Sequence, residues 1–230
     1  MIGIIGALNE ELEAILKDVT DLEEIKLRIR TFYKGKINNK EVVIVLAGIG
    51  KVNAAITTSI LIEKFNVESI INIGVAGGQN GVKHKDVVIS REVLYHDVDV
   101  VSIGKYVKGQ IPGSDALFYA DEELLNKTKR ILRNLNFNFK IGKIASGDQF
   151  IYSSDKLKDI NRLYSDIYAV EMEAAAIAHT ATLYNIPFII YRSISDIIDN
   201  ENQNEDFYKF LKDASLNAAI VLKELINILW

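Results

Sequence analysis

SIINIGVAGG, residues 69–78, is the stretch of sequence that decides the fold. Residues 69–74 form an almost continuous apolar run, which is typical of a β-strand covered on both faces in a parallel sheet. We expect the glycines at 74, 77 and 78 to end this strand. A strand buried on both sides needs covering layers, so the fold class depends on whether helices flank it in the sequence.

Helical and strand patterns do alternate on both sides of residues 69–74, which indicates an α/β fold with crossover helices. We predict one domain, residues 1–230, with a mixed, mostly parallel central β-sheet flanked by α-helices. The strands are expected at 2–8, 25–37, 41–47, 69–74, 86–94, 139–145, 167–170 and 188–194, and the helices at 10–18, 52–65, 121–135, 154–163, 174–184 and 206–230. Residues 95–115 show no sustained period and are predicted to be a long loop that contacts substrate or another subunit.

The composition excludes several classes of function. Twenty-seven basic and 31 acidic residues give a net charge of -4. The chain lacks a Lys/Arg cluster of the kind that neutralises a phosphate backbone, so we do not expect a nucleic-acid partner. The chain has no cysteine, which rules out disulfides and thiolate chemistry and is compatible with a reducing cytoplasm. The N-terminus does not resemble a signal peptide, and no run of about 18 apolar residues predicts a membrane span, so we expect a cytoplasmic protein.

The polar residues that follow the predicted strands are the candidates for a functional site, because ligands of such sheets bind beyond the carboxyl ends of the strands. Glu10 and Glu11 open a helix, where an acidic side chain is also explained by the helix dipole. Two carboxylates at that position would repel a phosphate, whereas a phosphate-binding enzyme would offer backbone amides and a cation. The pair therefore favours activation of water over phosphorolysis.

Two further strand ends carry unusual polar residues. Glu171 and Met172 follow a buried strand, where a carboxylate could accept hydrogen bonds from a ribose diol over an apolar thioether, while Glu173 is also explained as a first-turn helix acid. Arg192 and Asp196 lie at the end of an apolar strand. They form either a structural ion pair or a site in which burial raises the pKa of Asp196 enough for it to donate a proton.

Other signals in the sequence are weaker. Residues 48–53 partly match the dinucleotide fingerprint GxGxxG but lack the third glycine, so a tight turn that needs positive φ is the better explanation. His84, His96 and His179 show no metal-ligand spacing and are interpreted as structural. The nucleophile motif GxSxG does not occur, which disfavours a serine hydrolase.

Seven strings, in order along nearly the whole chain, resemble the bacterial 5'-methylthioadenosine/S-adenosylhomocysteine nucleosidases. They are IGIIGALNEE (2–11), AGIGKVNAA (47–55), INIGVAGG (71–78), YHDVDV (95–100), SGDQFI (146–151), VEMEAAAIAH (170–179) and SISD (193–196). The resemblance implies the nucleoside-phosphorylase-type fold and a homodimer. It also implies hydrolysis, without metal or cofactor, of 5'-methylthioadenosine, S-adenosylhomocysteine and 5'-deoxyadenosine.

The resemblance further implies roles for individual residues. Glu11 would activate the attacking water with help from Arg192, and Asp196, oriented by Ser195, would protonate or hydrogen-bond N7 of adenine. The remaining implied substrate contacts are Glu173 on the ribose hydroxyls, Met172 on the sugar, Phe150 on the adenine face, the Ile151 backbone on the Watson–Crick edge and Phe207 on the 5' substituent, with Glu171, Ala76 and Gly77 also in the site. The partner subunit would complete the 5' pocket with its Val100, Ile103 and Pro112.

The chain departs from the family pattern at two positions. Val75 stands where many members have a serine, so we do not count position 75 as catalytic. Ile103 stands where an aromatic residue is common, which bears on the preferred 5' group. Three alternatives stay open: a purine nucleoside phosphorylase, disfavoured by Glu10 and Glu11; a hydrolase of futalosine-type nucleosides; and a non-catalytic nucleoside-binding module, which would need neither Glu11 nor Asp196.

Overall fold

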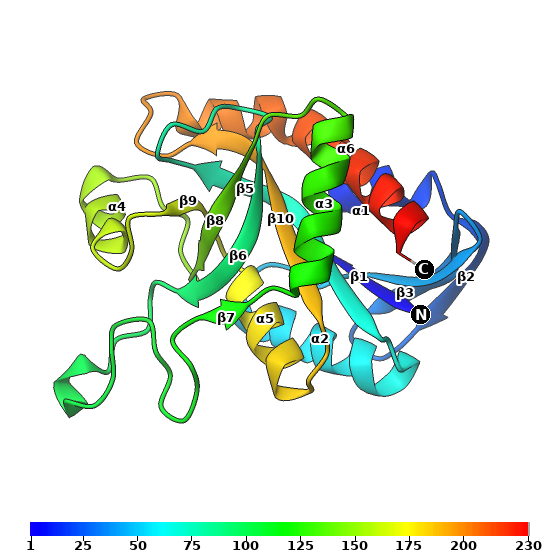
Figure 1. Cartoon of the computed structure of the whole chain (residues 1–230), viewed down its shortest axis with the longest axis horizontal. Coiled ribbons are helices and arrows are strands. Elements are labelled where there is room, and N and C mark those ends of the chain that lie inside the picture. The colour runs from blue at the N-terminus through cyan, green and yellow to red at the C-terminus, as the bar shows by residue number, and fades with distance from the viewer. Residues whose placement is uncertain (230) are drawn as a thin grey trace.

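The computed structural model describes residues 1–229, and its elements follow the predicted alternation of strands and helices (Figure 1). The strands are β1 (Ile2–Gly6), β2 (Thr20–Lys26), β3 (Thr31–Ile37), β4 (Lys40–Leu46), β5 (Ser69–Gly78), β6 (Val87–Tyr95), β7 (Phe118–Tyr119), β8 (Phe139–Ser146), β9 (Ile167–Glu171) and β10 (Phe188–Ile197). The helices are α1 (Asn9–Leu16), α2 (Lys51–Phe65), the 3₁₀ turn η1 (Val101–Ile103), α3 (Glu122–Asn134), α4 (Ser154–Asn161), α5 (Ala174–Leu183) and α6 (Gln203–Ile228).

The central sheet is mixed and partly closed. β5 pairs in parallel with β1 along its first half and with β10 along nearly its whole length, while its last residues pair antiparallel with β9. β9, β8, β6 and β10 then follow one another, so these strands and β5 close into a ring, and β4, β3 and β2 extend the sheet beyond β1. The mixed sheet is as predicted, but the closure was not expected because strand spacing in the sequence carries no information on which edges meet.

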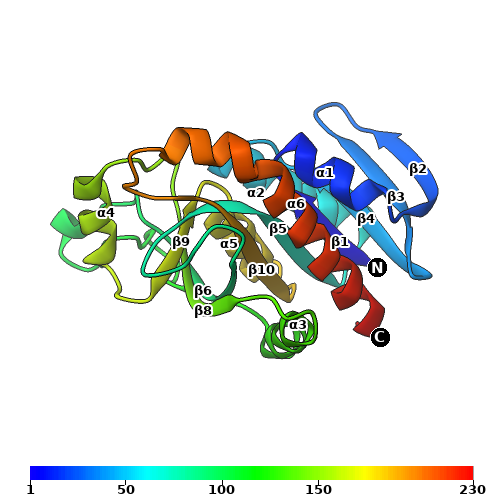
Figure 2. The ribbon, with the colours of Figure 1, turned by 90° about the horizontal axis from the view of Figure 1, so that it is seen from above.

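Helices cover both faces of this sheet, as the apolar run at 69–74 predicts. One hydrophobic cluster packs α2 and α5 against the sheet, and a second packs α1, α3 and α6 against the other face. Within β1, Ile5 belongs to the first cluster and Ile2 and Ile4 to the second, so this strand is buried on both sides. Figure 2 shows α4 at one end of the molecule and the β2–β3 hairpin at the other.

The helix boundaries follow local chemistry. The Asp121 side chain accepts a hydrogen bond from the backbone N–H of Leu124 (2.9 Å) and caps α3, whose first turn carries Glu122 and Glu123. α2 ends at Phe65 and is followed by Asn66, a capping residue whose left-handed φ of 50° suits asparagine. Within residues 1–229, no helix has the length and apolar character needed to cross a bilayer.

Three predicted boundaries were wrong. Residues 25–37 are not one strand: the chain reverses at Leu27–Arg30, where the N–H of Leu27 donates to the carbonyl of Arg30, and the preceding strand β2 is a mostly exposed edge that has no apolar signal. Gly74 and Gly77 do not end β5, because its ladders with β10 and β9 continue to Gly78, which is the last residue of the strand. β10 likewise runs on through Asp196 to Ile197.

Candidate active site

A cavity of about 140 Å³ lies at the carboxyl ends of the strands, where the predicted polar residues converge. It continues into a smaller hollow of about 30 Å³ that Ile151 and Gln203 help to line. The residues around the main cavity are Ala7, Leu8, Glu11, Ile49, Val75, Ala76, Gly77, Phe150, Val170, Glu171, Met172, Glu173, Ser195, Asp196 and Phe207. Side chains from distant segments of the chain therefore line one cavity.

Glu11 is held at the start of α1 by backbone donors. Its Oε2 accepts hydrogen bonds from the N–H groups of Ala7 (2.6 Å) and Leu8 (3.1 Å), and its Oε1 accepts one from Val75 (3.2 Å). Burial raises the pKa of Glu11, and these hydrogen bonds together with the charge of Arg192 oppose the rise. Glu10, the other acid of the predicted pair, is exposed to solvent, so only Glu11 belongs to the cavity.

Gly74 makes room for the Glu11 carboxylate. A Cβ at this position would stand 2.9 Å from Oε1 of Glu11 and 3.5 Å from the guanidinium of Arg192. A side chain here would displace one of these two groups, so glycine in β5 serves close approach and does not terminate the strand.

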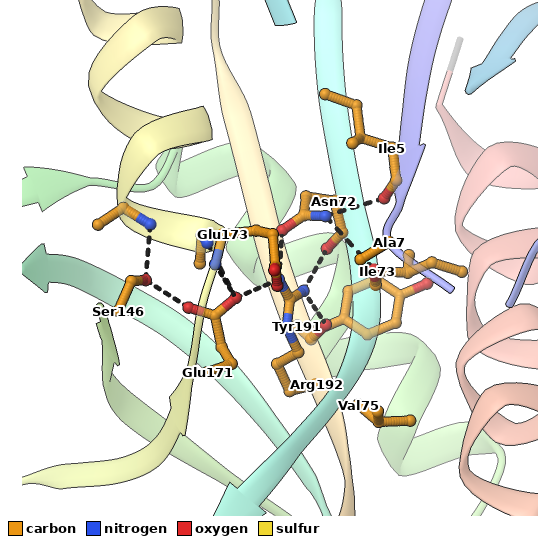
Figure 3. Close-up of polar contacts among 12 residues, drawn as sticks. Ile5, Ala7, Asn72, Ile73, Val75, Ser146, Glu171, Glu173, Tyr191 and Arg192 are labelled. Atoms are coloured by element: carbon orange, nitrogen blue, oxygen red, sulfur yellow. Dashed lines mark hydrogen bonds and ion pairs between the residues drawn. The ribbon is translucent and has the colours of Figure 1, made fainter. Parts of the chain in front are cut away.

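Arg192 is the buried cation of the site, with 2% of its surface exposed (Figure 3). Its guanidinium donates to Oε2 of Glu171 (2.7 Å) and to Oδ1 of Asn72 (2.6 Å). The partner of Arg192 is thus Glu171, and the alternative of an ion pair with Asp196 is wrong. Asn72, the one polar residue inside the apolar run of β5, also donates to the carbonyl of Ile5 (2.8 Å) and so ties Arg192 to β1.

Glu171 has protein partners on both oxygens. Oε1 accepts a short hydrogen bond from the Ser146 hydroxyl, and Oε2 accepts from Arg192 and from the N–H groups of Glu173 and Ala174. The Ser146 hydroxyl in turn accepts from the N–H of Ala175 (2.8 Å). Glu171 therefore fixes the junction of β9 and α5 and positions its neighbours, and its oxygens are already bound by protein donors where the sequence predicted an acceptor for ribose hydroxyls.

Glu173 faces the cavity from the start of α5. Its Oε1 accepts a hydrogen bond from the N–H of Gly50 (2.8 Å). Gly50 has a φ of 95°, a backbone conformation that glycine adopts readily. Burial first, and then the negative charge of Glu171, raise the pKa of Glu173 to about 8. The tight glycine turn expected at residues 48–50 is confirmed, and Gly50 brings it into contact with the site.

A β-bulge places Asp196 in the cavity. The register of β10 against β5 shifts between Ile194 and Asp196, which redirects the following side chains. Oδ1 of Asp196 accepts from the Ser195 hydroxyl (2.7 Å), and Oδ2 accepts from the side-chain amide of Gln203 (2.7 Å). Burial raises the pKa of Asp196, and both hydrogen bonds oppose the rise.

Aromatic and apolar side chains complete the walls. The rings of Phe150 and Phe207 meet edge to face with centroids 6.1 Å apart, and Met172 lines the cavity beside them. Phe150 is 45% exposed, so this wall borders solvent.

Sequence reasoning missed Asn72, whose polarity within an apolar strand was a usable signal, and Gln203, which lies in a polar stretch that carries no signal.

Other predicted residues lie outside this cavity. Val100, Ile103 and Pro112 belong to the segment 96–117, which projects from the body of the molecule at the lower left of Figure 1 and lines no part of the cavity. His84 contacts Asp206 (3.1 Å), and His179 stacks on the ring of Phe118. Among residues 1–229, no group of three His, Asp or Glu side chains converges as a metal site requires.

Comparison with known proteins identifies the family. The model of the phosphorylase superfamily matches residues 1–227. A 5'-methylthioadenosine/S-adenosylhomocysteine nucleosidase of Staphylococcus haemolyticus is 46% identical over the full length of both chains. This chain belongs to the 5'-methylthioadenosine/S-adenosylhomocysteine nucleosidase family. As a nucleosidase, it is an N-glycosyl hydrolase.

Solved members of the nucleosidase family share the fold closely. The Neisseria meningitidis nucleosidase in complex with methylthio-immucillin-A is 38% identical, covers 99% of each chain and superposes with a TM-score of 0.95. The Colwellia psychrerythraea nucleosidase in complex with adenine is 34% identical, covers 98% of this chain and 94% of its own, and has a TM-score of 0.92. The fold class predicted from the sequence is thereby confirmed.

The raised pKa of Glu173 predicts a cost in stability. A carboxyl group whose pKa is higher in the folded than in the unfolded state binds its proton more tightly in the folded state. The contribution of Glu173 to stability therefore falls as the pH rises from 4.5, the ordinary pKa of a glutamate, towards about 8. We expect Glu173→Gln, which keeps an acceptor for Gly50, to be about 1–3 kcal/mol more stable than the wild type at neutral pH and above.

Urea unfolding near pH 5 and near pH 8 checks this expectation. The stability difference between Glu173→Gln and the wild type should shrink at the lower pH, and Glu10→Gln, at an exposed acid, should show no such trend. A Glu173→Gln protein that loses stability with rising pH as steeply as the wild type would refute the assignment.

Proposed function

We propose that this chain hydrolyses the N-glycosidic bond of 5'-methylthioadenosine and S-adenosylhomocysteine, and also of 5'-deoxyadenosine, releasing adenine and the 5'-substituted ribose. The observation that carries the proposal is the presence in one cavity of two buried acids with raised pKa values, Glu11 and Asp196. The names of the relatives support 5'-methylthioadenosine and S-adenosylhomocysteine as substrates, and the inhibitor and adenine bound to solved relatives agree with them. For 5'-deoxyadenosine the support is the resemblance of the sequence alone.

Asp196 is suited to assist departure of the base. Cleavage leaves an electron pair on adenine, and a proton delivered to N7 neutralises it. Because burial raises the pKa of Asp196, the protonated acid is accessible nearer to neutral pH than for an exposed aspartate. The Ser195 hydroxyl holds the carboxyl group in orientation through Oδ1. In this proposal Phe150 stacks on the base, and the Ile151 backbone contacts its Watson–Crick edge.

Glu11 is suited to activate water on the other side of the bond. A general base works best when its pKa lies near the operating pH, and burial shifts Glu11 in that direction. Ionised Glu11 would take a proton from water as its oxygen adds to C1', while nearby carboxylates stabilise the cationic sugar. Glu173 would hold the ribose hydroxyls, with Met172 packed against the ring.

The same residues disfavour phosphorolysis. The N–H groups of Ala7, which follows β1, and of Val75, which lies within β5, could bind an anion but already donate to the Glu11 carboxylate. A phosphate ion in that place would meet a negative charge and lose these donors. A water molecule carries no net charge, so the Glu11 carboxylate does not repel it.

We also propose that the chain functions as a homodimer. Ile49 lines the cavity and is 55% exposed, and the apolar surface continues along α2 with Val52, 69% exposed, and Ile56, 45% exposed. Clustered exposed apolar side chains of this kind mark interaction surfaces. The projecting segment 96–117 carries Ile103, also exposed, and in a symmetric dimer it would close the 5' end of the neighbouring cavity with Val100, Ile103 and Pro112.

The cytoplasmic location stays a prediction.

Product analysis tests the proposed reaction. Incubation with 5'-methylthioadenosine, S-adenosylhomocysteine, 5'-deoxyadenosine and aminodeoxyfutalosine should yield adenine and a free 5-substituted ribose from the first three, at rates that phosphate does not increase. Formation of a ribose 1-phosphate would show a phosphorylase instead. A marked preference for aminodeoxyfutalosine would reassign the substrate class.

The roles of the two acids predict the behaviour of conservative variants. Glu11→Gln and Asp196→Asn should fold and bind substrate but lose about 10²–10⁴-fold in kcat, the usual contribution of one general acid or base. Glu10→Gln is the matched control, because this exposed acid lies next to Glu11 on the same helix and should keep wild-type kcat. Near-wild-type adenine release by either cavity variant would remove its assigned role.

The dimer proposal predicts a paired loss of association and substrate affinity. Val52→Lys places a charge on the exposed face of α2 and should shift the protein towards monomer in analytical ultracentrifugation, with about a 10-fold rise in KM for 5'-methylthioadenosine. Leu216→Lys, on an exposed face of α6, should change neither property. A wild type that sediments as a monomer at all concentrations would end the proposal.

A further inference from the structure

Gln203 is a buried amide at the base end of the cavity that the proposed mechanism does not use. It is the first residue of α6, is 4% exposed and lines the small hollow that continues the main cavity. Its Nε2 donates to Oδ2 of Asp196 (2.7 Å) and to the carbonyl oxygen of Ile151 (2.9 Å). Its Oε1 accepts from the N–H of Asp199 (3.3 Å).

The two acceptors around Nε2 define a place for one planar NH₂ group. A backbone carbonyl can only accept, so the group between Ile151 and Asp196 must carry hydrogens in both directions. The amino group of a 6-aminopurine has this form, since its nitrogen lies between N7 and N1 and bears two in-plane hydrogens. If Asp196 faces N7 and Ile151 faces the Watson–Crick edge, as in the proposed function on which this inference rests, the substrate's amino group and the Gln203 amide need the same position.

The size of the cavity supports mutual exclusion. The main cavity and the adjoining hollow are about 140 Å³ and about 30 Å³, whereas sites for small-molecule ligands usually enclose about 300–1,000 Å³. Gln203 lies at the wall of the smaller hollow and fills the space beside Ile151. A nucleoside needs more room than these two spaces provide, and displacement of Gln203 would supply part of it at the base end.

The segment that carries Gln203 is built from local contacts. Between β10 and α6, the N–H of Gln203 donates to the carbonyl of Asn200 (3.0 Å), and that of Asn200 donates to Ile197 (3.3 Å). Asp199 has a φ of 68°, which is uncommon for a residue other than glycine. The ladder of β10 with β5 ends at Ile197, so the displacement of Gln203 proposed below would leave that ladder intact.

We propose that the Gln203 amide is an internal stand-in for the 6-amino group of the substrate, and that the base displaces it on binding. Gln203 keeps Asp196 and Ile151 hydrogen-bonded while the site is empty. It competes with adenine for both acceptors, so it weakens binding of substrate and product alike and returns when adenine leaves. Because Gln203 is out of the base site during bond cleavage, it does not contribute to the chemical step.

Two variants separate this role from a merely structural one. Gln203→Ala removes both the bulk and the donor, and Gln203→Met keeps the bulk without the donor. In Gln203→Ala we expect the inhibition constant of adenine and the KM for 5'-methylthioadenosine to fall together by about 10-fold, the effect of no longer breaking two hydrogen bonds, with kcat within about threefold of the wild type. Gln203→Met should move both constants in the same direction, and Asn204→Ala, at the next and exposed position, should leave them unchanged.

The outcomes are distinguishable. If Gln203 instead positions Asp196 during catalysis, both variants will lose kcat and bind adenine no more tightly than the wild type, and the proposal is overturned. An adenine inhibition constant within about twofold of the wild type in both variants overturns it equally. A wild type that releases no adenine from either thio-nucleoside refutes the proposed function itself. Should Gln203→Ala not fold, Gln203→Met alone decides the question.

Discussion

The buried pair of Arg192 and Glu171 is the contact on which the cavity depends, because a guanidinium with 2% exposure is tolerated only when its charge and its donors are matched. Arg192 comes from β10 and Glu171 from β9, while Asn72 of β5 and Ser146 of β8 supply the next hydrogen bonds. Four strands of the closed ring are thereby joined at the end where the cavity opens. Removal of either charge would leave the other buried without the opposite charge that it pairs with.

The cavity gathers more acidic groups than the single positive charge of Arg192 can neutralise. Glu11, Glu173 and Asp196 line the cavity in addition to Glu171, and burial raises the pKa of each of the three. Such clustering costs stability, and it is also what allows carboxyl groups to exchange protons near neutral pH. Backbone N–H groups from Ala7, Val75 and Gly50 fix oxygens of Glu11 and Glu173 in place. The stability cost and the proposed chemistry have the same physical origin.

The closure of the sheet explains why the important side chains come from inside strands. β5 and β10 continue past the points where their apolar patterns stop, since Gly74 and the bulge before Asp196 let polar groups face the cavity while the ladder remains intact. The same geometry leaves the base end small enough for one amide, that of Gln203, to fill it. The cavity is therefore both preformed at the ribose end and closed at the base end.

The amino-acid sequence alone determined the α/β class, the position of most elements and the set of strand ends from which the site is built, because apolar periodicity and motif order are local properties of the chain. The residue pattern left Glu10 and Glu11 equivalent, and only the family resemblance selected Glu11. The sequence did not name the partner of Arg192, because burial and pairing depend on which strands meet in space. Gln203 was invisible for the same reason: its role arises only from where the turn before α6 places it. Tertiary structure decided these points, since desolvation and hydrogen-bond geometry are properties of the assembled site.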